Sequence, residues 1–455
     1  MRKSAYNLIS QFNFVKKFCH RTCTRRLGRC GGKLQCIENE FERQGALIMT
    51  DIREKLNVNI ESPHWDEAYK KALNEPGIPE WLTEKFYKDL HEEAGILPDV
   101  LDTLLMALPY VCEVPELVLY AKTLYNIFAL KLPAGEAITK FEQLKAPEGV
   151  ENPIGYDLLL AFPLFAHVRP SWEELRARGI DFDVAKDTLT WGNDLLKGVM
   201  EAEGKLSTSP YLYNVHRVFI YVTQFRVGRL RFELHPNSKR PAKVFKNREG
   251  RLAALMCDCV IHKSGYILGS GGCADEEGSY DADFVETETT YEGYAVSDET
   301  HVAEKTRTVL SKSEWTPVFV PGDTVLKVHI SPGEGFTKEN CDKAFERARD
   351  IFARCYPEYD FKGFVTSCWM LSPVLREILK PESNIISFQN RFKVFPGEDN
   401  ALDVYQYVYK LHPKSVDEVD FVSLPEGNSM QRGVKQKGLE GKFVHQCNGF
   451  IPYKA

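Results

Sequence analysis

The spacing of hydrophobic residues changes near residue 205, and this change limits the folds open to the chain. Before that point apolar residues recur every three or four positions, as Trp81, Phe86 and Leu90 do, which is typical of amphipathic helices. After it, apolar and polar residues alternate, as in the segment 230–234, which is typical of half-buried strands. The pattern predicts an α/β (α+β) chain: a helical N-terminal domain at 49–205, then a mixed, mostly antiparallel sheet with flanking helices at 206–455.

Local signals refine this prediction at two places. Ser171 is expected to cap a helix, with Glu174 completing a capping box. Gly228 breaks the alternation within 221–234, which predicts a bulge inside a single strand.

Residues 1–48 differ from the rest of the chain. They carry ten Lys or Arg against three acidic residues, and four of the twelve cysteines: Cys19, Cys23, Cys30 and Cys36. Only Cys19 and Cys23 have a spacing that suits zinc, and no continuous apolar core for a secretory signal is present. We expect a disordered basic tail or an over-long start that precedes Met49.

The whole chain has a net charge of −6, which gives no reason to expect nucleic acid as a partner. The sequence contains no run of about 18 apolar residues, so it predicts no helix that spans a membrane. The remaining cysteines are mostly scattered singly, which favours a reducing compartment, and we expect a cytoplasmic protein.

The region 324–411 is the most informative. It predicts a strand at 324–330, a Pro/Gly loop, a long helix from the N-cap Thr337 to about Cys355, and a strand at 361–370. A short helix at 373–379 and two further strands, at 384–395 and 404–409, are expected to follow.

This order of elements resembles the second half of a GNAT-superfamily N-acyltransferase domain. The segments 225–233, 325–332, 367–371 and 383–392 are also similar to a family of bacterial acyltransferase-domain-containing proteins that pair a helical N-terminal domain with a GNAT-like C-terminal domain. The resemblance covers roughly residues 50–450. It implies acyl-CoA as co-substrate, with its pyrophosphate at the loop and the following helix N-terminus, where backbone amides bind anions.

Two positions depart from the superfamily pattern Q/R-x-x-G-x-G/A. Ile330 stands where Gln or Arg is expected, and Glu334 adds a negative charge, which Lys338 offsets. The predicted cofactor-binding residues are Ile330, Ser331, Gly333, Gly335, Phe336, Thr337 and Lys338.

Direct acyl transfer to an amine needs a base with a pKa near neutrality. His329, close to the end of the strand at 324–330, is the predicted base, and Cys368 is a second catalytic candidate that could face the same cleft. A structural role for each is the alternative: a strand-end histidine bonded to a carbonyl, and a buried apolar thiol.

The residues predicted to line the substrate site are polar or aromatic. Gln389 and Arg391 are expected to share one face of a strand, and Glu286 and Glu288 one face of another strand. The alternative for each pair is a solvent-exposed sheet face with no binding role. The predicted substrate-binding residues are Trp369, Asn384, Gln389, Arg391, Glu286 and Glu288.

The function that these observations favour is an N-acyltransferase that moves an acyl group from acyl-CoA to a small-molecule amine or a peptide, with the helical domain shaping the acceptor pocket. No metal, nucleic acid or membrane partner is expected. The sequence contains no G-x-S-x-G or H-E-x-x-H motif. A catalytically degenerate GNAT fold that binds a ligand or a protein is the alternative, and a carrier-protein phosphopantetheine arm is a third candidate ligand.

Overall fold

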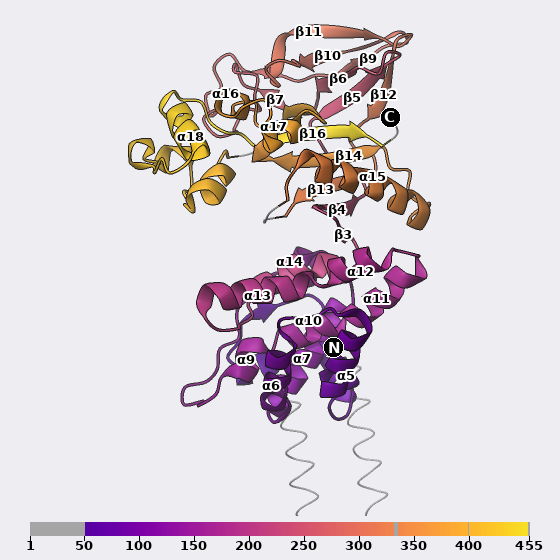
Figure 1. The fold of residues 1–455 in the computed structure, drawn as a ribbon, viewed down its shortest axis with the longest axis vertical. Coiled ribbons are helices and arrows are strands. Elements are labelled where there is room, and N and C mark those ends of the chain that lie inside the picture. The colour runs from indigo at the N-terminus through magenta and orange to yellow at the C-terminus, as the bar shows by residue number, and fades with distance from the viewer. Residues whose placement is uncertain (1–50, 332–334, 399, 454–455) are drawn as a thin grey trace, which may run out of the picture.

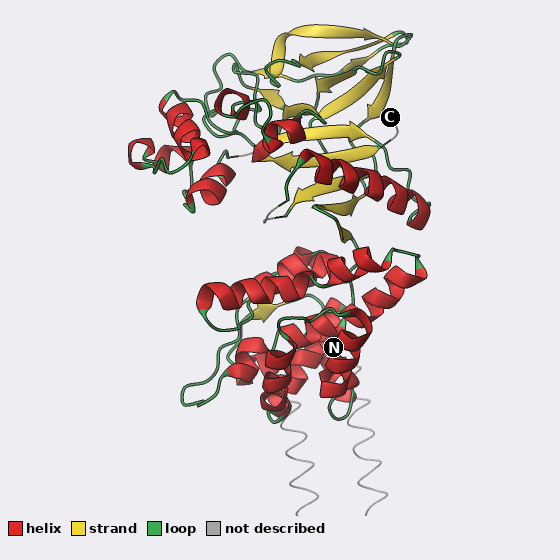
Figure 2. Cartoon of the chain, viewed as in Figure 1, coloured by secondary structure: helices red, strands yellow, loops and turns green. Residues whose placement is uncertain are grey.

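The computed structural model describes residues 51–331, 335–398 and 400–453 of the chain. A helical N-terminal region stands beside a sheet-rich C-terminal region (Figure 1, Figure 2). This arrangement confirms the predicted fold class. The predicted basic tail at 1–48 lies outside the described residues.

Helix α7 (Pro115–Phe128) is the centre of the helical region, and it begins with Pro115 because a proline at the first helical position loses no hydrogen bond. It packs against α4, α6 and α10, and both Leu117 and Phe128 are fully buried. The other helices are α3 (Ile52–Lys55), α4 (Trp65–Asn74), α5 (Glu84–Ala94), α6 (Leu101–Cys112), α8 (Ala134–Ala137), α9 (Ile154–Leu158), α10 (Ala161–Ala166), α11 (Val168–Ala177), α12 (Phe182–Leu189), α13 (Trp191–Glu203) and α14 (Pro210–Ile220). The short strands β1 (Ile60–Glu61) and β2 (Lys140–Phe141) pair beside them.

The expected cap at Ser171 is wrong. Helix α11 already begins at Val168, and the Ser171 hydroxyl, inside the helix, donates to the carbonyl of His167 at 2.7 Å. The preceding helix α10 ends at Ala166, only two positions before α11 begins. The chain passes from one helix to the next at His167 without a side-chain cap. Helices also continue past residue 205 through α14, and the domain boundary at 205 stays a prediction.

The first sheet of the C-terminal region has the strand order β15-β16-β14-β13-β4-β3. Its strands are β3 (Gln224–Val227), β4 (Leu230–His235), β13 (Val325–Ile330), β14 (Gly363–Cys368), β15 (Lys393–Pro396) and β16 (Cys447–Pro452). Strands β13 and β14 are parallel and are joined by the long helix α15 (Lys338–Cys355), whereas the other neighbouring pairs are antiparallel.

Helix α15 confirms the prediction from its sequence. Thr337 is the N-cap, and its hydroxyl accepts a hydrogen bond from the amide of Asn340. The apolar face of the helix covers one face of the sheet, where Phe345 meets Phe232 and Phe364 edge to face. Alternation along the strands leaves Lys327 and His329 on the opposite face.

The expected bulge at Gly228 is also wrong. Strands β3 and β4 form a hairpin in which Val227 pairs with Leu230, so Gly228 and Arg229 are its two-residue turn. Gly228 has a φ of +58°, a left-handed conformation that two-residue hairpin turns require.

The second sheet packs on the face of the first sheet that α15 leaves open. Its order is β11-β10-β6-β5-β12, and β9 pairs with β10. The shared core includes Val244 and Met256 from the second sheet, and Val325 and Phe450 from the first. The strands are β5 (Ala242–Asn247), β6 (Leu252–Met256), β9 (Val285–Glu286), β10 (Thr290–Val296), β11 (Ala303–Ser311) and β12 (Trp315–Phe319), with a separate pair β7 (Val260–Ile261) and β8 (Tyr280–Asp281).

Two of the expected strands near the C-terminus are helical. The segment expected as a strand at 384–395 is split into helix α17 (Asn384–Gln389), capped by the Ser383 hydroxyl, and strand β15. The segment 404–409 contains a π-helix at Tyr405–Tyr409. The short helix expected at 373–379 is confirmed as α16 (Leu375–Ile378), and it packs against α18 (Ser429–Leu439) in a small separate core.

Candidate functional site

The parallel pair β13 and β14 separates toward the ends where the two strands finish. Their backbone pairing joins Leu326 to Phe364 and Lys327 to Val365. One step further, the Thr366 hydroxyl donates a hydrogen bond to the carbonyl of Val328 at 2.9 Å. Backbone pairing between the two strands stops before this point, and the sheet opens between them.

The loop after β13 leads into the first turn of α15. Gly335 has a φ of +79°, and the Asn340 side-chain amide donates to its carbonyl at 2.9 Å. The exposed Lys338 ammonium lies 2.9 Å from Asp342. Because Thr337 caps the Asn340 amide, that amide does not face a ligand.

The predicted cofactor-binding residues still to be placed are Ile330, Ser331, Gly333 and Phe336. Ile330 ends β13 and packs against the core, and the Phe336 ring contacts the Phe388 ring in a tilted arrangement, with 5.3 Å between the ring centroids. Gly333 and Glu334 lie outside the described residues. Ser331 begins the loop.

His329 forms the chemically most distinctive contact on the polar face of the sheet. Its Nε2 lies 2.6 Å from Oε2 of Glu233, which projects from the neighbouring strand β4. Lys327 Nζ lies 3.9 Å from the same carboxylate oxygen. About a quarter of each side chain of the His329–Glu233 pair is exposed, so the pair remains accessible at the open end of β13.

Burial determines the charge state of this pair. It lowers the pKa of His329 below its ordinary value, and the hydrogen bond to Glu233 offsets only part of the effect. Burial raises the pKa of Glu233, but the His329 hydrogen bond and the Lys327 charge outweigh it, so this pKa is below its usual value. At neutral pH the imidazole is therefore neutral and donates from Nε2 to an ionised carboxylate, which leaves the Nδ1 lone pair as a base.

The helical region reaches the same polar face. Arg231 pairs with His329 across β4 and β13, and its guanidinium lies 4.8 Å from the ring centroid of Trp191 in α13. Burial lowers the pKa of Arg231 to about 10. The site is therefore bordered by an aromatic side chain from the N-terminal region.

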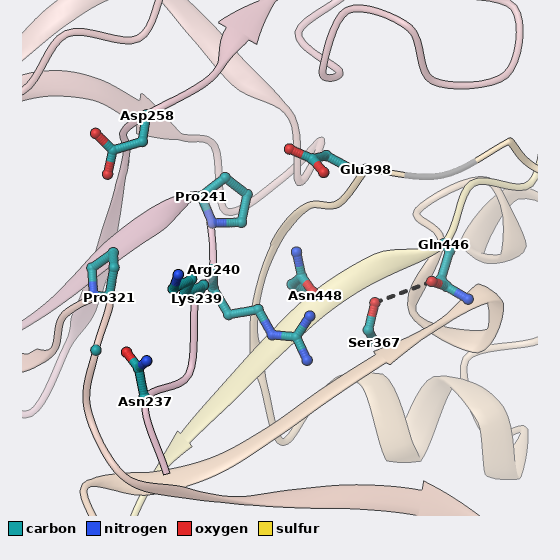
Figure 3. Close-up of a pocket in the computed structure, with 11 residues that line it drawn as sticks. Asn237, Lys239, Arg240, Pro241, Asp258, Pro321, Ser367, Glu398, Gln446 and Asn448 are labelled. Atoms are coloured by element: carbon teal, nitrogen blue, oxygen red, sulfur yellow. Dashed lines mark hydrogen bonds between the residues drawn. The ribbon is translucent and has the colours of Figure 1, made fainter. Parts of the chain in front are cut away.

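A cavity of about 530 Å³ lies on this face where the two sheets meet (Figure 3). Ser367 of β14 and Asn448 of β16 contribute to it from the first sheet, and Arg240 reaches it from the segment between β4 and β5. Figure 3 shows the Arg240 guanidinium directed toward Asn448 and Ser367.

Cys368 is not on the side of His329. Strand alternation places it with Phe364 and Thr366 on the α15 face, so the expectation that Cys368 faces the same cleft is wrong. Burial raises the pKa of its thiol to about 11, which keeps it protonated at neutral pH.

Several predicted substrate-binding residues have structural contacts. Gln389 is fully buried at the end of α17 and donates to the carbonyls of Met370 and Ser372, so it shares no strand face with Arg391. Arg391 forms an ion pair with Asp342 at 2.7 Å. The prediction of a polar strand face here is wrong because the segment is helical.

The other predicted substrate-binding residues lie elsewhere. Asn384 begins α17. Trp369 is buried in the small C-terminal core and stacks near Tyr407, with 6.4 Å between ring centroids. Glu286 pairs with Lys312 at 2.7 Å on the second sheet, and Glu288 lies in the exposed turn after β9, so the two do not share a strand face.

Sequence reasoning identified His329 but missed Glu233 and Arg240. Alternation in 230–234 did place Glu233 on the polar face, but nothing in the sequence indicates which strand, 96 positions away, lies beside it. Within the described residues, no group of three or more His, Cys, Asp or Glu could hold a metal ion. No single described helix is long and apolar enough to cross a bilayer, although the sharply bent pair α6 and α7 passes that test together.

A parallel strand pair that opens beside a helix, within an otherwise antiparallel sheet, defines the GNAT-like class of domain. The family model of the GNAT-like C-terminal domain matches residues 224–451, half of the chain. The chain belongs to this family, which confirms the resemblance stated from the sequence.

Solved structures share the fold over most of the chain. An acyltransferase in complex with decanoyl-CoA and teicoplanin is 17% identical, with a TM-score of 0.54, and the match covers 88% of this chain and 98% of that one. An acyltransferase in complex with CoA and 10C-teicoplanin is 16% identical, with the same TM-score and coverage. No curated protein matches the chain.

Proposed function

We propose that this chain is an acyl-CoA-dependent N-acyltransferase, in which the His329–Glu233 pair removes a proton from the attacking amine. The observation that carries the proposal is the 2.6 Å contact between the two side chains on the polar face, beside the opening of β13 and β14. The family and the acyl-CoA complexes of the structural neighbours support acyl-CoA as co-substrate.

In the proposed reaction, the amine nitrogen forms a bond to the thioester carbonyl carbon, and the bond from that carbon to sulfur breaks. His329 Nδ1 accepts the proton that the amine loses, and Glu233 stabilises the resulting imidazolium. The thiolate leaves and takes up a proton, so the products are an amide and a free thiol. Neither Cys368, which is protonated and on the other face, nor an acyl-enzyme is needed.

The acceptor approaches from the side that the second sheet and the helical region border. Trp191 beside Arg231 supports the prediction that the helical domain shapes the acceptor pocket. A small-molecule or peptide-like amine suits this space. Eight free cysteines among the described residues suit the cytoplasm, where acyl-CoA is made.

The test is transfer from decanoyl-CoA to amines, followed as thiol release. His329→Gln should lower kcat by about 10²- to 10⁴-fold while decanoyl-CoA still binds, the usual contribution of a general base. Unchanged kcat in this variant would refute the assigned role.

A binding protein without catalysis is the second candidate. It is favoured by Ile330 at the Gln/Arg position and by the capped Asn340 amide. Calorimetric titration separates the two: no heat with any acyl-CoA, and no thiol release, favours the second candidate.

A further inference from the structure

The cavity of about 530 Å³ between the sheets is within the range of small-molecule sites, roughly 300–1,000 Å³. Its floor is built from the first sheet and from Arg240, while Lys239, Asp258 and Glu398 are exposed around it. Exposed acidic side chains beside a half-buried arginine disfavour a multiply charged anion such as a diphosphate.

Arg240 is a half-buried cation without a hydrogen-bonded acidic partner. Its Nε makes no hydrogen bond in the protein, and no carboxylate of the described residues lies within ion-pair distance of its guanidinium. Burial lowers its pKa, and the nearby charge of Glu233 offsets this in part. Arg240 and His329 therefore both lie near Glu233.

Asn448 provides a hydrogen-bond acceptor in the same cavity as the Arg240 donor. Its side chain is 3% exposed, and its Nδ2 donates to the carbonyl of Pro396 at 3.1 Å, which fixes the orientation of the amide. The Oδ1 atom is buried and has no hydrogen-bond partner in the protein. Ser367 beside it already donates to Gln446 at 3.2 Å. The cavity floor thus offers one unpartnered cationic donor and one unpartnered acceptor.

We propose that this cavity binds the carboxylate of the acceptor, so that the substrate is an amino acid whose carboxylate pairs with Arg240 and whose amine, bound in its neutral form, lies beside His329. A planar guanidinium matches a carboxylate in a bidentate geometry. An N–H or hydroxyl group of the same molecule donates to Asn448 Oδ1. The inference rests on the proposed function, and it names the substrate class of that site.

The experiment compares the common amino acids with their carboxamides as acceptors, with decanoyl-CoA as donor. A carboxamide keeps the amine but removes the negative charge. The acids should be used with a higher kcat/KM than their amides, by about 10- to 100-fold, as expected for a charge-assisted pair. Arg240→Met should abolish this preference by slowing the acids alone, and Arg240→Lys should restore part of it.

Arg248→Met is the matched control, because Arg248 is exposed in the turn between β5 and β6 and bonds only to the Ser313 carbonyl. The Arg248→Met variant should keep the higher kcat/KM for amino acids over their carboxamides. Two results would overturn the carboxylate site. One is an equal kcat/KM for amino acids and their carboxamides. The other is no transfer to any amino acid by protein that binds decanoyl-CoA in a calorimeter. Absence of decanoyl-CoA binding would instead refute the proposed function.

Discussion

Replacing Glu233 with Gln removes the charge beside His329 while keeping the size of the side chain. A hydrogen bond to a charged group contributes about 1.5–3 kcal/mol. Since one pKa unit corresponds to about 1.4 kcal/mol, the substitution should lower the pKa of His329 by a further 1–2 units. The two side chains are only about a quarter exposed, so solvent screens this interaction less than at an open surface.

The sign of the effect on the pH profile follows from the role of His329. A base acts in its neutral form, so kcat/KM expressed per neutral amine rises with pH through the pKa of His329 and is constant above it. In Glu233→Gln this rise should move 1–2 pH units lower, because the carboxylate no longer stabilises the imidazolium. The plateau should fall by about 10- to 100-fold, because the imidazolium formed during transfer loses the same stabilisation.

The assay is thiol release from decanoyl-CoA with an amine acceptor, from about pH 4 to pH 9, because the rise lies below the ordinary histidine pKa of about 6.5 and moves lower in the variant. Glu314→Gln, at an exposed position after β11, is the control and should leave the profile unchanged. A rise that stays in place or moves to higher pH in Glu233→Gln would refute the assignment of these two residues.

Three further predictions concern other parts of the molecule. Burial lowers the pKa of His216 to about 3, so this group favours the folded state above its unfolded pKa of about 6.5 and loses that contribution as pH falls toward 3. His216→Leu should therefore reduce the pH dependence of the unfolding free energy near pH 5 by about 1.4 kcal/mol per pH unit, measured by urea denaturation, and an unchanged slope would contradict this. Cys368→Ser should retain most of the transfer activity, and intact-mass spectra should show no acyl adduct on the wild type; an adduct would contradict direct transfer. Asp181 pairs with Arg347 at 3.0 Å and Arg354 at 2.9 Å between the two regions, so Asp181→Asn should lower the urea unfolding free energy by about 0.5–1 kcal/mol, and no loss would show that these exposed pairs contribute nothing.

The part of the fold that sequence predicts well is governed by local signals. The helix after β13 has a strong N-cap, Thr337, and a regular apolar face that includes Phe345, so periodicity alone predicts it. The segment 384–389 was predicted as part of a strand but is helical, because β-branched and aromatic residues also suit a buried helix. The N-cap residue Ser383 is the local signal that favours the helix.

The site depends more on contacts between distant segments. His329 could be predicted because it lies near the end of a strand before a Gly-rich loop. Glu233 and Arg240 could not, because their roles depend on which strands neighbour one another and on the packing of the second sheet. Cys368 was placed on the wrong face because the register between β13 and β14 is not visible in the sequence.

The most direct test of the central claim is a crystal structure with a non-hydrolysable decanoyl-CoA analogue. The account predicts that the pantetheine arm passes between β13 and β14, and that the carbonyl replacing the thioester lies on the His329 side of the sheet. An analogue bound with this carbonyl on the α15 face beside Cys368, or away from the opening between the two strands, would contradict it.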